Sequence, residues 1–558
     1  MPRSSASRFL AHVTIPALAL ASALAASALA ASALAAAAPP PQGSEPVDLG
    51  MVTRIRDEGF HRSRVMATAA GLTDGIGPRL TASPAEREAA EWARGRFADW
   101  GLRAWLEEFP FGEGWSFSRS EVRLVAPVEA PLVALPLAWT PGTEGPVRGA
   151  AVRVKLESEE DLEKQKGELS GKVVFLDEPR EPEGPDDDER EEFRRYDDDE
   201  LAEIESFDVP VGERRPDWVE RARKRRELAE KRNRFLIDEG VVATVELSSR
   251  DHGIVRLGAG GSRGETGRSR GVPALTMAAE HYRRVLRLLD AGTAVELEID
   301  VEATFHQGER PGHNVLAEIP GGDLAGEVVL AGAHLDSWHA GTGATDNAAG
   351  CAVVMEAARI LKALGVEPRR TLRFALWSGE EQGLLGSRAY VEEHLATRPD
   401  PTDPDELALP RRLRKPTWPI EPKPDHARFS GYFNLDNGGG RIRGVWAQEN
   451  AAAVPIFEAW LQPFADLGAT TVTLENTSGT DHLPFDRAGL PGFQFIQDGL
   501  DYWSRTHHTH LDTYDHLREA DLKQSAVVLA SFLYHAAMRD RPLPRKPMPQ
   551  RPPDDGED

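Results

Sequence analysis

The chain has 558 residues, more than one hydrophobic core usually supports, so we expect two folded domains or one domain with an insertion. Hydrophobic residues make up 40% of the chain, an ordinary fraction for a globular protein. The net charge of −24 argues against nucleic acid as a partner, because neutralising phosphates requires a dominant basic face.

The first 38 residues are typical of a secretory signal. Arg3 and Arg8 precede an alanine- and leucine-rich run that ends before Pro39, which is the order of regions in such signals. We therefore expect residues 1–38 to be a signal peptide, with an uncleaved anchor as the alternative. The protein is then secreted or periplasmic, without membrane contact after cleavage. The single cysteine, Cys351, has no partner for an internal disulfide, so the core or bound metal must hold the fold.

Residues 47–108 show a helical pattern, within a first domain segment expected over residues 47–112. Ser83 is a predicted N-cap, Pro84 occupies the first helical position, and Gly101 closes this helix. Residues 117–302 change to short β-rich runs with one charged helical stretch. This change from a helical pattern to short β-rich runs predicts a β-rich domain that is inserted into the first domain.

Two charged segments lie within the predicted insertion. Residues 177–200 carry fourteen acids and four arginines, whereas residues 214–234 carry ten bases and four acids. Such runs usually form solvated surface, and their opposite charges attract each other. We interpret both as solvated parts of the insertion rather than as binding surfaces.

Residues 305–540 repeat a rhythm of strand, loop and helix. Alternation of this kind predicts an α/β fold with a mostly parallel central sheet flanked by helices. The expected strands are 327–333, 371–377, 429–435 and 493–496, and the expected helices are 347–364 and 384–394. The Pro-rich residues 397–423 are expected to form a surface excursion, and residues 541–558 a disordered tail.

Each predicted strand leads into side chains that bind metals. In chain order these are His334 with Asp336, Glu380 with Glu381, Asp436, and the run His507–Asp512; Asp346 precedes the helix expected at 347–364. Ligands bind beyond the carboxyl ends of such strands, and burying these groups together is costly without cations. Two imidazoles and three carboxylates make a sensible donor set for two divalent ions. Asp336 and Asp512 are each spaced to orient a neighbouring metal-binding histidine.

Six motifs, in this order, resemble the M28 family of zinc exopeptidases: NVLAEIPG, GAHLDS, GATDNAAG, ALWSGEEQGLLGS, YFNLDN and HHTHLDTYD. The resemblance covers residues 312–537 and the helical piece before Glu108. The central segment is similar to the protease-associated domain that interrupts some of these peptidases.

The resemblance implies two zinc ions that share one carboxylate. The ligands would be His334, Asp346 and Asp436 for one ion, and Asp346, Glu381 and His508 for the other. Glu380 would be the general base, and Asp336 would assist catalysis by orienting a metal-bound imidazole. The family pattern fits His508 better than His507 or His510.

These features together predict an exported di-zinc exopeptidase that acts on a peptide terminus or on dipeptides. The ligand set leaves aminopeptidase, carboxypeptidase and dipeptidase activity open, and the inserted domain favours the carboxypeptidase Q-like branch. The alternative is a non-catalytic receptor, or a glutaminyl cyclase-like enzyme of the same fold. The expected partner is a peptide substrate. A homodimer is compatible with the resemblance, although no stretch of the sequence indicates one.

Overall fold

The computed structural model describes residues 45–178, 180–181, 193–207, 217–265 and 268–551. Apart from residues 45 and 46, all of these belong to one compact unit. The predicted signal peptide, residues 1–38, lies outside the described residues. Within the described part, no helix combines the length and the apolar character needed to cross a membrane.

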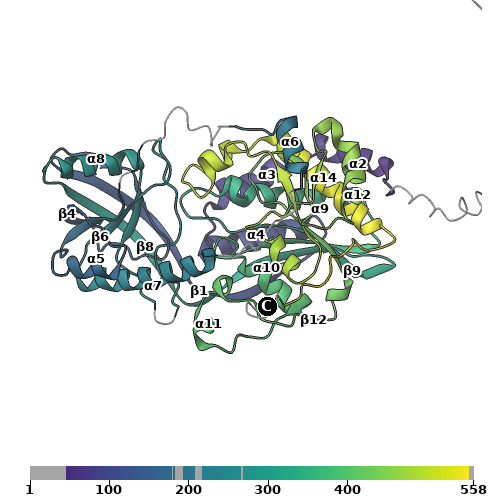
Figure 1. Cartoon of the computed structure of the whole chain (residues 1–558). Helices are drawn as coiled ribbons and strands as arrows, with labels where there is room; N and C mark the ends of the chain where they lie inside the picture. The colour runs from purple at the N-terminus through teal and green to yellow at the C-terminus, as the bar shows by residue number, and fades with distance from the viewer. Residues whose placement is uncertain (1–44, 179, 182–192, 208–216, 266–267, 552–558) are drawn as a thin grey trace, which may run out of the picture. The chain divides into compact units, whose positions relative to one another are not determined.

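A mixed sheet provides the framework for the site (Figure 1). The four strands expected between residues 305 and 540 are present, parallel and adjacent, in the order β16, β13, β9, β10. Their bounds are β9 Leu324–His334, β10 Arg370–Trp377, β13 Phe429–Asn434 and β16 Gly492–Gln497. Strand β14 (Ile442–Trp446) runs antiparallel to β16, and β15 (Thr471–Thr473) runs parallel to β14. The prediction of an α/β fold is confirmed.

Helices cover both faces of this sheet. The first face packs against α2 Leu49–His61, α3 Val65–Ala70, α4 Pro84–Asp99, α9 Ala349–Ala363, α12 Val454–Leu461 and α14 Glu519–Met538; the second packs against α10 Leu385–Tyr390 and α13 His482–Arg487. On β10, Leu372, Phe374 and Leu376 join the first core, whereas Ala375 and Trp377 join the second. This alternation follows from the two-residue period of a strand and explains why β10 is apolar on both faces from Phe374 to Trp377.

Helix α4 begins and ends as the sequence predicts. The Ser83 hydroxyl accepts a hydrogen bond from the backbone N–H of Glu86 at 3.2 Å, and Pro84 is the first helical residue. The helix ends at Asp99, and Gly101 adopts a φ of +80°, which suits glycine. The capped helix packs against β1 and β8, described next.

The inserted region is joined to the sheet by two long strands rather than by a linker. Strands β1 (Arg103–Ala126) and β8 (Glu296–Ile319) have 24 residues each and pair antiparallel, with bulges, along most of their length. Strand β8 also pairs with β10 at one end and with β4 of the insertion at the other. The boundaries expected at residues 117 and 302 therefore fall inside paired strands.

The insertion extends the sheet and has its own core. Its strands are β2 Ala130–Leu132, β3 Ala134–Pro136, β4 Val147–Arg153, β5 Lys172–Phe175, β6 Ala243–Leu247 and β7 Ala274–Met277; its helices are α5 Glu159–Lys164, α7 Asp217–Asp238 and α8 Ala279–Asp290. Helix α6 (Asp198–Glu205) lies between α5 and α7 in the chain but packs against β15 of the main sheet. Phe175 lies against Tyr282 in the core of the insertion, with tilted rings whose centroids are 4.9 Å apart. Strands β4, β5, β6 and β7 are parallel in that order.

Two later segments complete the chain. The excursion expected at 397–423 contains α11 Pro404–Ala408, a 3-10 turn η5 Arg411–Leu413 and part of a strand pair, β11 Ala396–Thr397 with β12 Glu421–Pro422. Residues 541–551 differ from the disordered tail expected over 541–558. Leu543 is buried in the main core, and Arg545 donates to the carbonyl oxygen of Phe429 at 2.6 Å, which holds this segment in place. Residues 552–558 lie outside the described part.

Candidate metal centre

Three neighbouring strands bring the predicted site residues to one edge of the sheet. His334 is the last residue of β9, Glu380 and Glu381 lie in the turn after β10, and Asp436 follows β13. The carboxyl ends of these parallel strands meet at the same edge, which explains the clustering. Two loops supply the rest: Asp346 from the π-helical turn η3 (Ala344–Ala348) and His508 from the segment after η8 (Tyr502–Thr506).

Five of these side chains form two groups that meet at Asp346. His334 Nε2 lies 3.2 Å from Asp346 Oδ1 and 3.2 Å from Asp436 Oδ1. His508 Nε2 lies 3.4 Å from Asp346 Oδ2 and 3.1 Å from Glu381 Oε2. The two oxygens of Asp346 therefore face different histidines, as a carboxylate that bridges two cations would.

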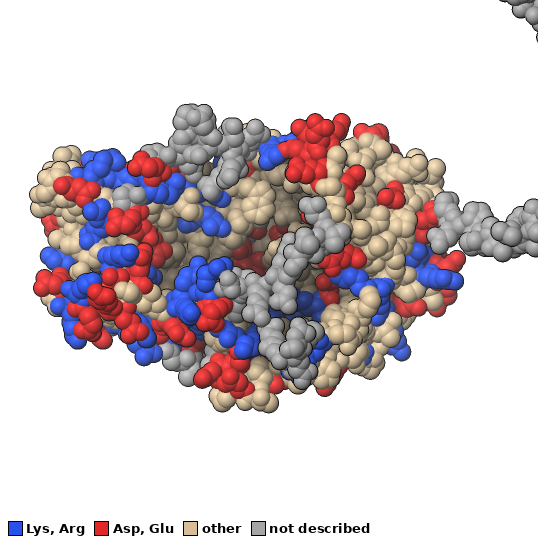
Figure 2. Space-filling model, viewed as in Figure 1, with Lys and Arg blue, Asp and Glu red and all other residues tan. Residues whose placement is uncertain are grey.

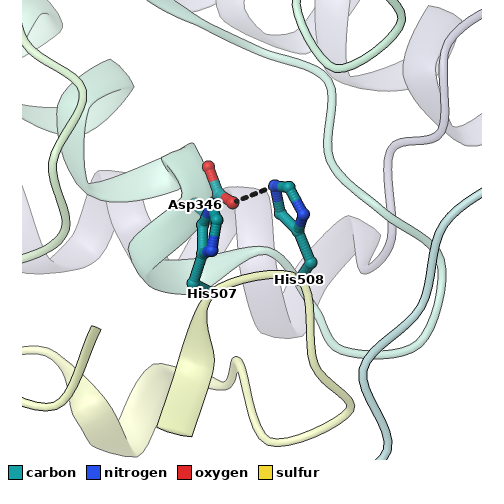
Figure 3. A group of neighbouring side chains, drawn as sticks. All are labelled: Asp346, His507 and His508. Atoms are coloured by element: carbon teal, nitrogen blue, oxygen red, sulfur yellow. Dashed lines mark ion pairs between the residues drawn. The ribbon is translucent and has the colours of Figure 1, made fainter. Parts of the chain in front are cut away.

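Three histidines lie close together in the last loop. Figure 3 shows His507 and His508 both near Asp346. The donor atoms of Asp346, His507 and His508 are close enough together to hold one metal ion. The rings of His507 and His508 are 3.8 Å apart, and burial and His508 lower the pKa of His507 to about 3. His510 instead accepts a hydrogen bond from the backbone N–H of Val255 through Nδ1. His508 is thus the histidine that contacts two carboxylates of the cluster.

The residues fit zinc. Asp346 Oδ2 and Glu381 Oε1 are buried, and neither has a hydrogen-bond partner among the described residues. Burial raises the pKa of Glu381 to about 7, and burial with the nearby charge of Asp436 raises the pKa of Glu380 well above its usual range. Burial alone would lower the pKa of His334, but Asp436 and the other carboxylates raise it. A site with this much unbalanced negative charge is stabilised by cations, and its N and O donors are those that zinc prefers.

Asp336 connects two of the strand ends. Its carboxylate accepts from the Thr81 hydroxyl at 2.9 Å and from the backbone N–H groups of Glu380 and Glu381 at 3.2 and 3.4 Å. His334 Nδ1 lies 2.9 Å from the backbone carbonyl oxygen of Asp336 but 3.6 Å from its carboxylate. The group that orients His334 is therefore the carbonyl, and the carboxylate positions the glutamate turn.

Asp512 does not contact His508 as the spacing predicted. Its carboxylate accepts from the backbone N–H and the hydroxyl of Thr345, both at 2.7 Å, and from the backbone N–H of Asp346 at 3.1 Å. Asp512 thus fixes the loop of the bridging aspartate. The Nδ1 atom of His508 instead lies 3.3 Å from Arg256 Nη2, a residue of the inserted region.

Sequence reasoning missed two arginines that shape the site. Arg79 is fully buried and donates to the carbonyl oxygens of Leu335, Thr342 and Gly343 at 2.7, 2.7 and 2.8 Å, which holds the loop between the first two ligands. Arg256 of the inserted region contacts His508. Arg79 and Leu335 are 256 positions apart in the sequence, and Arg256 and His508 are 252 positions apart. No local sequence pattern therefore marks either arginine as part of the site.

Curated relatives match the chain in part. Carboxypeptidase Q of Mus musculus is 28% identical over 274 residues, which cover 49% of this chain and 52% of that protein. The match thus spans about half the length of this relative.

Solved structures match over more of the chain. A peptidase M28 precursor from Shewanella amazonensis has a TM-score of 0.62 and 25% identity, covering 90% of this chain and 99% of that one. A zinc aminopeptidase from Bacillus subtilis, 17% identical, has a TM-score of 0.53 and covers 85% of this chain and 95% of its own. At 17% identity, the similarity to the zinc aminopeptidase from Bacillus subtilis concerns the fold alone.

The α/β fold and the clustered donors agree with a match to a peptidase family. Residues 314–533 match the model of peptidase family M28. This part of the chain, which holds all the predicted site residues, belongs to that family.

Proposed function

We propose that the protein is an exported di-zinc exopeptidase. The observation that carries this proposal is the position of Asp346, whose two carboxylate oxygens face His334 and His508 on opposite sides. Together with Asp436 and Glu381, these residues form two donor sets that share one member. In this proposal each set holds one zinc ion.

The proposed chemistry is hydrolysis of a peptide bond. Bound zinc would supply Lewis-acid chemistry, acidifying water and polarising a carbonyl group. Glu380 takes the proton from the attacking water and later delivers it to the leaving amine. Its position supports this role, because Asp336 holds its backbone N–H at 3.2 Å beside Glu381. Burial raises the pKa of Glu380, and cationic charge nearby would lower it again, which suits a group that gains and loses a proton.

The substrate class follows from the relatives as a proposal. Carboxypeptidase Q and a zinc aminopeptidase are named for opposite peptide ends, so the substrate is proposed to be a peptide terminus or a dipeptide. We propose secretion or periplasmic export on the composition of residues 1–38. The similarity of the insertion to a protease-associated domain, over residues 117–302, remains part of this proposal.

Metal content and a substrate panel test the proposal. The purified chain is loaded with zinc, and its metal content is measured by mass spectrometry. It is then assayed with amino-acid p-nitroanilides, N-blocked peptides with a free C-terminus, and free dipeptides. Two zinc ions per chain with cleavage of one substrate class is the expected result. One ion with cyclisation of N-terminal glutamine would identify a glutaminyl cyclase-like enzyme. No metal and no turnover would identify a non-catalytic relative.

A further inference from the structure

A cavity of about 500 Å³ opens beside the candidate metal centre. Glu381 and Gln382 of the glutamate turn and Trp338 line one side of it, and residues of α7 in the insertion line another. The volume lies in the range of small-ligand sites. In Figure 2, a hollow near the middle of the visible face shows Asp and Glu on its floor and Lys and Arg at its left rim. The cavity can therefore receive the part of a substrate that extends from the metals.

The wall of the cavity is joined across two segments. Arg223 of α7 pairs with Glu406 at 2.9 Å and donates to the carbonyl oxygen of Leu413 at 2.7 Å. These contacts hold α7 against the excursion that follows α10, and Leu413 itself lines the cavity. The charged helix is thus part of the site's surroundings rather than a separate solvated segment.

Positive charge dominates the cavity, although the chain as a whole is acidic. Five arginines line it: Arg225, Arg226, Arg232, Arg263 and Arg268. Apart from Glu381, the acidic lining residues are Glu246 and Glu265. Arg232 Nη2 lies 3.8 Å from Glu246, Arg263 Nη2 lies 3.9 Å from Glu265, and Arg268 Nε lies 3.4 Å from Glu230 of α7. The five lining arginines outnumber these three acids.

One lining side chain also has a donor for a ligand. Arg232 Nε is buried and has no hydrogen-bond partner among the described residues. The side-chain amide of Gln382 lies 2.6 Å from the Thr81 hydroxyl, which also lies 2.9 Å from Asp336 Oδ2, and this contact holds Gln382 in the cavity wall. Guanidinium groups match the geometry of a carboxylate, with which they form strong charge-assisted hydrogen bonds.

We propose that this cavity binds a substrate carboxylate, so that the enzyme prefers anionic peptides. The carboxylate is either an acidic side chain or the C-terminus of the peptide, and arginines of α7 recognise it. This inference rests on the proposed peptidase function. Arg225, Arg226 and Arg232 belong to the segment 214–234, which we interpreted as solvated surface; they line the cavity, and Arg225 is also exposed to solvent.

Matched peptides and variants test the inference with the full, zinc-loaded chain. One pair of short peptides differs only in glutamate against glutamine, and a second pair differs only in a free against an amidated C-terminus. The double variant Arg225→Gln, Arg232→Gln removes two cavity charges. Arg221→Gln is the control, because Arg221 lies on the same helix but does not line the cavity. Binding of glutarate, measured by calorimetry, gives a readout independent of turnover.

Wild-type kcat/KM is expected to be about tenfold higher for the anionic member of one pair, and the responding pair identifies the source of the carboxylate. The double variant should lose this preference and bind glutarate about tenfold more weakly, while retaining zinc content, Tm and cleavage of the neutral peptide. The control should match wild type. Equal cleavage of both members of both pairs by wild type overturns the inference and leaves the peptidase proposal intact. Failure to cleave any peptide overturns the peptidase proposal, and glutarate binding then reports on the cavity alone.

Discussion

Replacing Glu380 by glutamine separates proton transfer from metal binding. The substitution keeps the shape of the side chain and leaves the backbone N–H bonded to Asp336. In the structure, Glu381 is the neighbour whose carboxylate contacts His508, at 3.1 Å, so the metal donors are not altered by the change at Glu380. Zinc content should therefore remain at the wild-type value.

The expected loss is in turnover. Positioned proton transfer contributes about 10²- to 10⁴-fold, which corresponds to about 3 to 5.5 kcal/mol of activation free energy. Steady-state kinetics should show kcat reduced within this range and KM changed little. The matched variant is Glu381→Gln, which weakens a donor to the site and should lower zinc content and zinc affinity. Near-wild-type turnover in Glu380→Gln with full metal content would refute the assignment of the base, and wild-type zinc affinity in Glu381→Gln would refute its role as a ligand.

Three further predictions concern the surroundings of the site. Arg256→Met should strengthen zinc affinity, because a donor-only cation lies 3.3 Å from the Nδ1 atom of a proposed ligand and repels both the metal ion and the proton that Nδ1 carries when Nε2 binds metal; competition with a chelating dye measures this, and unchanged or weaker affinity would contradict it. The metal-free wild-type protein should gain Tm relative to its Asp512→Asn variant as the pH falls from about 8 to about 5. Burial raises the folded-state pKa of Asp512 to about 7, above its unfolded value, so this carboxyl takes up a proton on folding in this window, and the comparison cancels the opposite contribution of buried histidines such as His507; a Tm difference that does not change with pH would contradict the reasoning. Leu543→Ala should lower the free energy of unfolding by about 2 to 5 kcal/mol in urea titrations, and a loss below about 1 kcal/mol would show that the C-terminal segment is not part of the core.

The sequence predicted the framework of the site because its signals are local. Strands such as β10 are short apolar runs, and Ser83 with Pro84 marks a helix start within two residues. The order of polar residues after each strand then places them at one sheet edge, since parallel strands end together.

What the sequence could not show depends on long-range contacts. The role expected of Asp512 followed from its spacing to His508, yet its carboxylate accepts hydrogen bonds from Thr345 and from the backbone N–H of Asp346. Arg256 comes from the insertion, and nothing near it in sequence marks its partner. The insertion boundaries expected at residues 117 and 302 fall inside the strands β1 and β8 for a related reason, because a change of composition does not reveal that two strands continue across it.

The shared strands β1 and β8 have a consequence for dissecting this protein. A domain that is attached by loops can be removed by cutting the loops. Here both connections are the strands β1 and β8, which pair with each other, and β8 also pairs with β10 of the sheet that carries the candidate metal centre. Excising the insertion would cut each strand in mid-ladder and expose unpaired backbone groups that favour aggregation. It would also remove Arg256 and the arginines of the cavity. Point substitutions on α7 are therefore the appropriate way to separate the insertion's contribution from that of the catalytic sheet.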